Sequence, residues 1–156
     1  MNTFEELQDE ACRDGIEVIE NYPFISDRID GLYVNSTIAL NKNLATCAEK
    51  SCVLAEELGH HYTAVGNIIN QSTVENRKQE LRGRIWAYNK QIGLSGLLKA
   101  YWNHCQNAHE VAEYLGVTDD FLNDALTYYR SKYGRCTQID NYVIFFEPNI
   151  AVMELI

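Results

Sequence analysis

The most constraining feature of this chain is a run in which two carboxylates are each followed, four residues later, by an imidazole. Glu56 and His60 form one pair, and Glu57 and His61 form the other. Residues four apart in an α-helix are stacked on one face, about 40° from each other. The run therefore predicts a helix that presents acidic and imidazole side chains together.

The same spacing occurs in the zinc-hydrolase motif H-E-x-x-H, in which the first and last residues bind the metal and the glutamate activates water. With Glu56 and His60 as ligands, Glu57 takes the position of the base. With Glu57 and His61 as ligands, that position falls on Leu58, which cannot accept a proton. The spacing therefore favours Glu56 and His60 as metal ligands and Glu57 as the general base, with glutamate in place of the motif's first histidine.

A catalytic zinc ion normally has three protein ligands and one position left open for water. The third ligand is expected from the next helix, which is predicted to begin at Ser72 or Thr73 and to end near residue 92. Glu80 is the first candidate on that helix, and Glu75 is the alternative. A solvated acidic helix face that binds no metal would contain the same residue types, so both interpretations stand on this pattern alone.

Two elements are predicted before the motif helix. Residues 3–20 have the spacing of an amphipathic helix, with Thr3 as its cap and Glu6 at the capping-box position. Residues 31–40 are rich in β-branched and aromatic side chains, and Asn35-Ser36 offers a turn between them. We therefore expect a helix followed by a short hairpin.

The motif helix is predicted for about residues 46–65, with Gly66 as its stop. After the second helix, three short helical patterns lie between residues 95 and 133, and two strands are predicted at residues 139–146 and 150–153. The predicted fold class is therefore α+β and mostly helical, with small strands near both ends of the chain.

Charge and cysteine content disfavour several classes of protein. The net charge of the 156 residues is −9, which disfavours functions that depend on neutralising phosphates, such as nucleic-acid binding. The five cysteines are an odd number without a C-x-x-C pair, which indicates reduced thiols in a cytoplasmic protein. The acidic N-terminus is unlike a signal peptide, and no apolar run approaches a membrane span, so no membrane association is expected.

Residues 108–126 have the pattern of a helix-turn-helix, with Gly116-Val117 between two amphipathic segments. Helices that read DNA bases usually carry arginine, lysine, asparagine or glutamine near their start. The second segment here begins with Thr118-Asp119-Asp120, which would repel phosphates. We therefore expect this unit to have a packing role or to contact a substrate protein, and not to bind DNA.

Several segments in combination resemble the ImmA/IrrE metallo-endopeptidases of phages and mobile elements. The segments that carry the resemblance are residues 52–61, the pattern Glu80-x-x-Gly83-x-x-Trp86-Ala87, the hairpin at 31–40, residues 109–117 and Phe146-Glu147-Pro148. Each segment is short, but together they extend over the chain from about residue 25.

The resemblance implies a minimal zincin-like peptidase core with a small β-sheet, expected at residues 1–94. An attached helical unit is expected at residues 95–134, and a C-terminal strand pair at residues 135–156 is expected to pack on the core. The resemblance also implies an activity, the cleavage of a helix-turn-helix repressor that is usually encoded beside the peptidase.

By the same resemblance, Glu56 and His60 correspond to the two ligands of the helix motif. Glu57 corresponds to the catalytic base, and Glu80 to the downstream acidic ligand. The expected ion is Zn²⁺, although one imidazole and two carboxylates form a harder ligand set that is also compatible with Mn²⁺ or another divalent ion. His61 either supports the ligands or contacts substrate, or it is a helix-surface histidine without a role.

Two other functions are compatible with parts of the sequence. A non-catalytic protein of the same fold could bind a repressor or another regulator without cleaving it. The carboxylate of Glu57 favours the enzyme, because a binding protein has no need of a base at this position. A DNA-binding regulator is opposed by the acidic charge balance.

Overall fold

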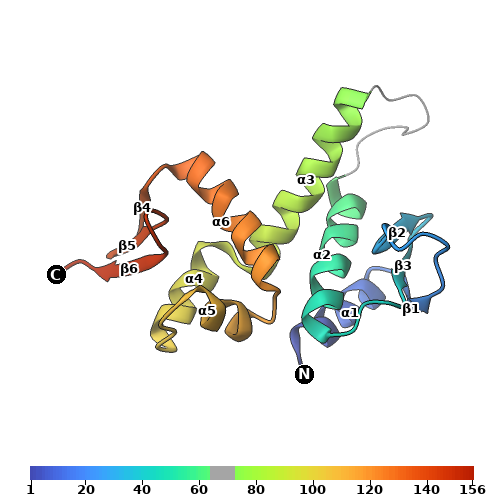
Figure 1. Ribbon diagram of the computed structural model, residues 1–156, viewed down its shortest axis with the longest axis horizontal. Helices are drawn as coiled ribbons and strands as arrows, with labels where there is room; N and C mark the ends of the chain where they lie inside the picture. The colour runs from blue at the N-terminus through green and yellow to red at the C-terminus, as the bar shows by residue number, and fades with distance from the viewer. Residues whose placement is uncertain (64–72) are drawn as a thin grey trace. The chain divides into compact units, whose positions relative to one another are not determined.

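The computed structural model describes residues 1–63 and 73–156. Within these residues the helices are accompanied by two three-stranded sheets, one near each end of the chain (Figure 1). This arrangement confirms the predicted α+β class. None of the described helices combines the length and apolar character that a membrane crossing requires.

The described chain divides into two compact units, Met1–Ala87 and Tyr88–Ile156. The boundary lies inside helix α3 (Thr73–Gln91), whereas the sequence placed it near residue 94. Helix α3 begins at Thr73, which is one of its two predicted starts, and the other, Ser72, lies outside the described residues.

The first helix, α1 (Thr3–Arg13), is capped by Asn2. The side-chain oxygen of Asn2 accepts a hydrogen bond from the backbone N–H of Glu5 at 2.8 Å, and the Glu5 carboxylate accepts one from the backbone N–H of Asn2 at 3.0 Å. This reciprocal pair is a capping box. It forms one residue earlier than the predicted box of Thr3 and Glu6.

The predicted helix over residues 3–20 is wrong beyond Arg13. Gly15 has a φ of +73°, a left-handed conformation that lets the chain leave the helix without steric cost. Strand β1 (Glu17–Tyr22) follows and pairs in parallel with strand β3 (Thr37–Asn41). The pairing of β1 with β3 therefore outweighs the apolar spacing that suggested a helix.

Strand β2 (Gly31–Val34) and β3 form the predicted hairpin. Asn35 and Ser36 occupy its turn with φ values of +50° and +59°, as a tight two-residue hairpin requires. The strand order is β1-β3-β2, with β2 antiparallel to β3. Strand β2 therefore lies at one edge of the sheet.

Helix α2 (Cys47–Thr63) packs against β2 and β3 and carries the acidic and imidazole run (Figure 1). Ile38 of the sheet and Leu58 of the helix are completely buried. Burial of one such side chain stabilises a fold by about 1.5–3 kcal/mol. The predicted end of this helix at Val65 and its stop at Gly66 lie outside the described residues.

Helices α2 and α3 approach each other at two glycines. A Cβ on Gly59 would lie 2.3 Å from the carbonyl oxygen of Gly83, and a Cβ on Gly83 would lie 2.6 Å from Nδ1 of His60. The backbones can lie this close only because neither residue has a side chain. The rings of Tyr62 and Trp86 stack across the same pair of helices, with centroids 5.1 Å apart.

The second unit contains the three predicted short helices, α4 (Gly93–Trp102), α5 (Ala108–Leu115) and α6 (Asp119–Tyr133). Gly116 ends α5 in the left-handed conformation, with a φ of +72°. Thr118 caps α6, because its hydroxyl accepts a hydrogen bond of 3.1 Å from a backbone N–H of the first turn.

The second unit ends in an antiparallel sheet that contacts α4 and α6. Its strands, in spatial order, are β4 (Cys136–Ile139), β5 (Tyr142–Phe145) and β6 (Ala151–Glu154). The single strand predicted at residues 139–146 is interrupted by a turn, in which Asp140 has a φ of +53°, and β4 was not predicted. The sheet groups with the second unit, and its expected packing on the core of residues 1–94 stays a prediction.

Replacing Gly59 with alanine should destabilise the first unit. The added Cβ would meet the Gly83 carbonyl group at 2.3 Å, so the two helices would have to separate. We expect the free energy of unfolding to fall by about 1–3 kcal/mol, the usual cost of overpacking, as measured by chemical denaturation and circular dichroism. Gly96→Ala is the matched control, because its Cβ would meet Leu115 at an ordinary 3.4 Å. Unchanged stability of Gly59→Ala would contradict the described packing.

Candidate active site

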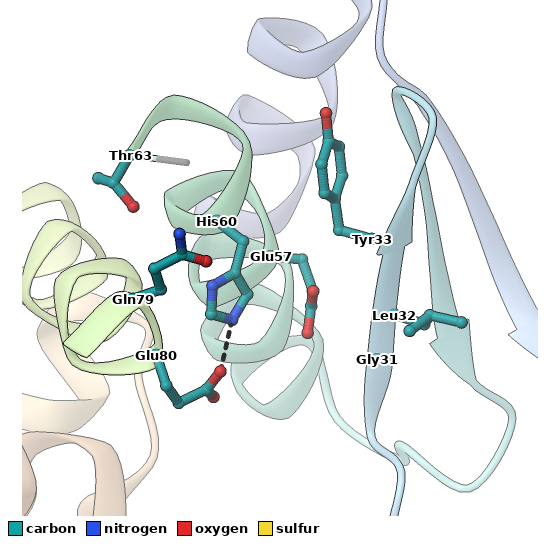
Figure 2. Close-up of a pocket in the computed structure, with 8 residues that line it drawn as sticks. All are labelled: Gly31, Leu32, Tyr33, Glu57, His60, Thr63, Gln79 and Glu80. Carbon is teal, nitrogen blue, oxygen red and sulfur yellow. Dashed lines mark ion pairs between the residues drawn. The ribbon is translucent and has the colours of Figure 1, made fainter. Parts of the chain in front are cut away.

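A cavity of about 310 Å³ lies in the first unit, where helix α2, the first half of α3 and the edge strand β2 meet (Figure 2). Its lining combines ionisable side chains of the two helices with residues of the strand. The lining residues are Gly31, Leu32, Tyr33, Glu57, His60, Thr63, Gln79 and Glu80. Three of the residues that the sequence assigned to a site therefore border one cavity.

His60 and Glu80 form an ion pair in this pocket. Nε2 of His60 lies 3.3 Å from Oε2 of Glu80. Arg84 also contacts Glu80, with its Nε 3.9 Å from the other carboxylate oxygen. The hydrogen bond between the two groups raises the pKa of His60 and lowers the pKa of Glu80. The fold thus brings together two predicted ligands from separate helices.

Glu57 extends from α2 towards strand β2 (Figure 2). Burial is the largest of the effects that raise its pKa from 4.5 to about 7, and His60 opposes part of this rise. The carboxylates of Glu80 and Glu56 raise the pKa further. A carboxyl group that titrates near neutral pH can both accept and release a proton, which is what a general base must do.

Glu56 does not line the pocket, although it lies one helical turn from His60. Its side chain is half-buried, and its charge acts on both Glu57 and His60. Among the described residues, no three or more histidine, cysteine, aspartate or glutamate side chains come together as a metal-binding group. His60 and Glu80 fit as two ligands, and the assignment of Glu56 rests on its helical spacing. The alternative ligand, Glu75, is exposed and does not line the pocket.

His61 faces the sheet through Tyr33. The Tyr33 hydroxyl lies 2.6 Å from Nδ1 of His61, and the two rings meet edge to face with centroids 5.3 Å apart. Tyr33 lines the pocket and His61 does not. Of the alternatives for His61, this contact favours a supporting role, because it holds Tyr33, a residue of the pocket lining.

Five lining residues have no role predicted from the sequence: Gly31, Leu32, Tyr33, Thr63 and Gln79. Tyr33 alternates with Gly31 along β2, and alternate residues of a strand share one face, so the hairpin pattern contained this signal. Thr63 follows His60 by three residues on α2, which places both on one side of the helix. Gln79 has no comparable signal.

Gly31 allows strand β2 to lie close to helix α2. A Cβ at this position would lie 2.6 Å from Cγ1 of Val53 and 3.2 Å from Cγ of Glu57. The strand therefore closes over the helix where Glu57 enters the cavity. This proximity contributes to the burial that raises the pKa of Glu57.

No protein-family model, curated protein or solved structure matches this chain. The functional assignment therefore depends on the pocket and on the residues that line it.

Replacing Glu57 with glutamine should stabilise the metal-free protein above neutral pH. Because the pKa of Glu57 rises from 4.5 to about 7 on folding, the stability linked to its proton is present below pH 4.5 and is lost as the pH rises through 7. We expect Glu57→Gln to be about 1–2 kcal/mol more stable than the native chain at pH 8, and the difference to shrink towards pH 5. Denaturation in a chelating buffer measures this.

The control for this experiment is Glu17→Gln, on an exposed position of β1. It should show no comparable gain at pH 8. A Glu57→Gln variant with the same pH dependence as the native chain would contradict the burial of this carboxyl group.

Proposed function

We propose that this protein is a metal-dependent endopeptidase that cleaves a regulatory protein. The observation that supports this proposal most directly is the meeting of His60, Glu80 and Glu57 in one pocket at the edge of a sheet. An imidazole and a carboxylate are common ligands of a catalytic divalent ion, and a second carboxylate beside them can serve as the general base.

In this proposal His60 and Glu80 would hold a divalent ion, expected to be Zn²⁺, with Mn²⁺ compatible with the same donors. Glu56 would complete the set on the strength of its helical spacing. Such an ion, when bound, would polarise the carbonyl group of the scissile peptide bond.

Glu57 is the proposed general base. Its carboxylate would accept the proton of the attacking water and later give that proton to the nitrogen of the leaving amine. In the metal-free protein the pKa of about 7 leaves neither protonation state of Glu57 strongly disfavoured at neutral pH. A cation bound beside it would lower this pKa and favour the carboxylate that accepts the proton of water. The closeness of β2 at Gly31 keeps water away from this carboxyl group on one side.

Strand β2 offers a place for an extended peptide. Among the described strands it pairs only with β3, so its other edge is open beside the pocket. An extended peptide can bind such an edge through backbone hydrogen bonds, as an additional strand. A peptide bound there would pass Glu57 and His60, because residues 31–33 of β2 line the same cavity.

The proposed substrate class, a helix-turn-helix repressor of a phage or mobile element, rests on the resemblance of the sequence to the ImmA/IrrE peptidases. The acidic charge of the chain favours a protein partner over nucleic acid. The segment that resembles a helix-turn-helix in this chain begins its second helix, α6, with Asp119 and Asp120, which opposes DNA binding.

One observation favours a second candidate, a non-catalytic protein that binds a regulator in the same pocket. No group of three metal-binding side chains is present in the described residues, and His60 and Glu80 already satisfy each other as an ion pair. Metal content separates the two candidates.

Replacing Glu80 with alanine should abolish stoichiometric metal binding. Protein purified without chelator and then exposed to Zn²⁺ is expected to hold about one ion per chain, measured by elemental analysis after dialysis. Loss of one of three ligands should weaken zinc binding by roughly a hundredfold or more. Glu75→Ala, on the same helix but outside the pocket, is the matched control and should retain the ion. Absence of metal from every variant would favour the non-catalytic protein.

Replacing Glu57 with glutamine should leave metal binding intact and remove peptidase activity. General-base catalysis contributes roughly 10²–10⁴-fold, so the rate should fall by at least about a hundredfold. The assay incubates a helix-turn-helix repressor of the proposed class with the zinc-loaded protein and follows its cleavage by mass spectrometry. Equal cleavage by the native chain and by Glu57→Gln would exclude the proposed role of this residue.

A further inference from the structure

A second cavity of the first unit, of about 620 Å³, opens on the sheet face that α2 does not cover. We refer to it as the apolar groove. The strands supply one wall through Ile19, Leu32, Val34, Thr37 and Ala39. The other wall consists of Tyr22, the last residue of β1, and of residues 23–26 and Ile29 in the connection between β1 and β2. Leu32 also lines the pocket that contains Glu57 and His60, so the two cavities are neighbours.

Strand pairing explains why the groove and the pocket lie on opposite faces of one sheet. In β2, Leu32 pairs with Ala39 and Val34 pairs with Thr37, and all four side chains line the groove. Tyr33, between Leu32 and Val34, and Gly31, before them, line the pocket and not the groove, whereas Leu32 borders both cavities. Figure 2 shows the Leu32 side chain directed away from Glu57, on the opposite side of the strand from Tyr33.

The groove leaves large apolar side chains in water. Leu32 is 48 % exposed and Val34 is 51 % exposed, both on the edge strand, and Ile25 of the opposite wall is fully exposed. Exposed apolar side chains that are grouped in this way are a common feature of binding sites. Because the two residues of β2 stand at the open edge of the sheet, a strand added at that edge would cover them.

We propose that the apolar groove selects the peptide that binds along β2, by receiving every second side chain of that peptide. This inference rests on the proposed function, because it assumes an extended substrate at this edge. An added strand lies about 4.8 Å from its neighbour, and its side chains alternate between faces in step with the neighbour's. The side chains beside Leu32 and Val34 therefore lie over the groove, and those between them enter the pocket.

The preferred substrate is thus an extended segment with apolar residues at alternate positions. Each apolar side chain that covers Leu32 or Val34 removes apolar surface from water on both partners. A polar side chain at the same position would lose its hydration without gaining a hydrogen bond, because the strand wall of the groove offers mainly hydrocarbon. The groove places no restriction on the intervening residues of the peptide, because their side chains point to the other face.

The test is peptide binding to the Glu57→Gln variant, which leaves the peptide intact. The probe is a short fluorescein-labelled peptide in which valine and threonine alternate, with lysines at both ends. The comparison peptide has the same composition, with its valines consecutive. By fluorescence anisotropy we expect the alternating peptide to bind roughly tenfold more tightly, and we expect a variant that also carries Val34→Thr to lose most of this preference.

Two further variants separate recognition from damage to the fold. Ile25→Thr changes a fully exposed side chain of the opposite wall, cannot disturb the core, and should also reduce the preference. Met153→Thr, on β6 of the second unit, has a similar exposure of 48 % and should leave the preference unchanged. Equal affinity for the two peptides, or a preference that survives both groove substitutions, would overturn the proposal.

The outcome is independent of catalysis. If the alternating peptide binds through the groove but the native zinc-loaded chain cleaves no peptide or repressor, the endopeptidase proposal fails while groove recognition stands. If cleavage occurs and the preference for alternating residues is absent, the groove proposal fails alone. Concentration-dependent dimerisation that Val34→Thr removes, measured by sedimentation, would identify a second copy of the chain as the occupant and also overturn the proposal.

Discussion

The candidate site depends on the close contact between the backbones of helices α2 and α3, at a point where neither helix has a side chain. Gly59 and Gly83 let α2 and α3 lie closer together than any pair of residues with side chains would permit. At this separation the imidazole of His60 reaches across to Glu80, one turn before Gly83 on the facing helix. If the helices lay further apart, the side chains of His60 and Glu80 would not reach each other. The pocket would then contain no ion pair between them.

Local patterns predicted the elements that depend on local interactions. The hairpin around Asn35-Ser36 and the helix that contains Glu57 are where the sequence places them, because turn residues and helical spacing act over a few positions. The segment after Gly15 was mispredicted, since its conformation depends on pairing with a strand that follows about twenty residues later. The strand β4 was likewise hidden, because a run of β-forming residues does not reveal the turn at Asp140.

Some residues of the candidate site were likewise predictable from local patterns, and others depend on neighbouring elements. The motif assigned Glu57 and His60 to one site on α2, and the pairing with Glu80 followed from the expectation of a second helix. Spacing alone also placed Glu56 among the ligands, but a helix face is broad, and the pocket occupies the part of it that holds Glu57 and His60. Which part of a helix face borders a cavity depends on the elements that pack beside the helix. Here strand β2 packs beside α2 and contributes Tyr33 to the site.

The missing side chain of Gly31 links the width of the cleft to the acidity of one carboxyl group. A methyl group at this position would overlap Cγ1 of Val53 and press on Glu57, so the edge strand would have to move outward. Solvent would then reach Glu57 more freely, and its pKa would return towards that of a free carboxylate. A larger residue at position 31 would therefore widen the cleft and lower the pKa of Glu57, while the rest of the fold stayed the same. Related proteins could acquire a wider cleft with a more acidic carboxyl group through this one replacement.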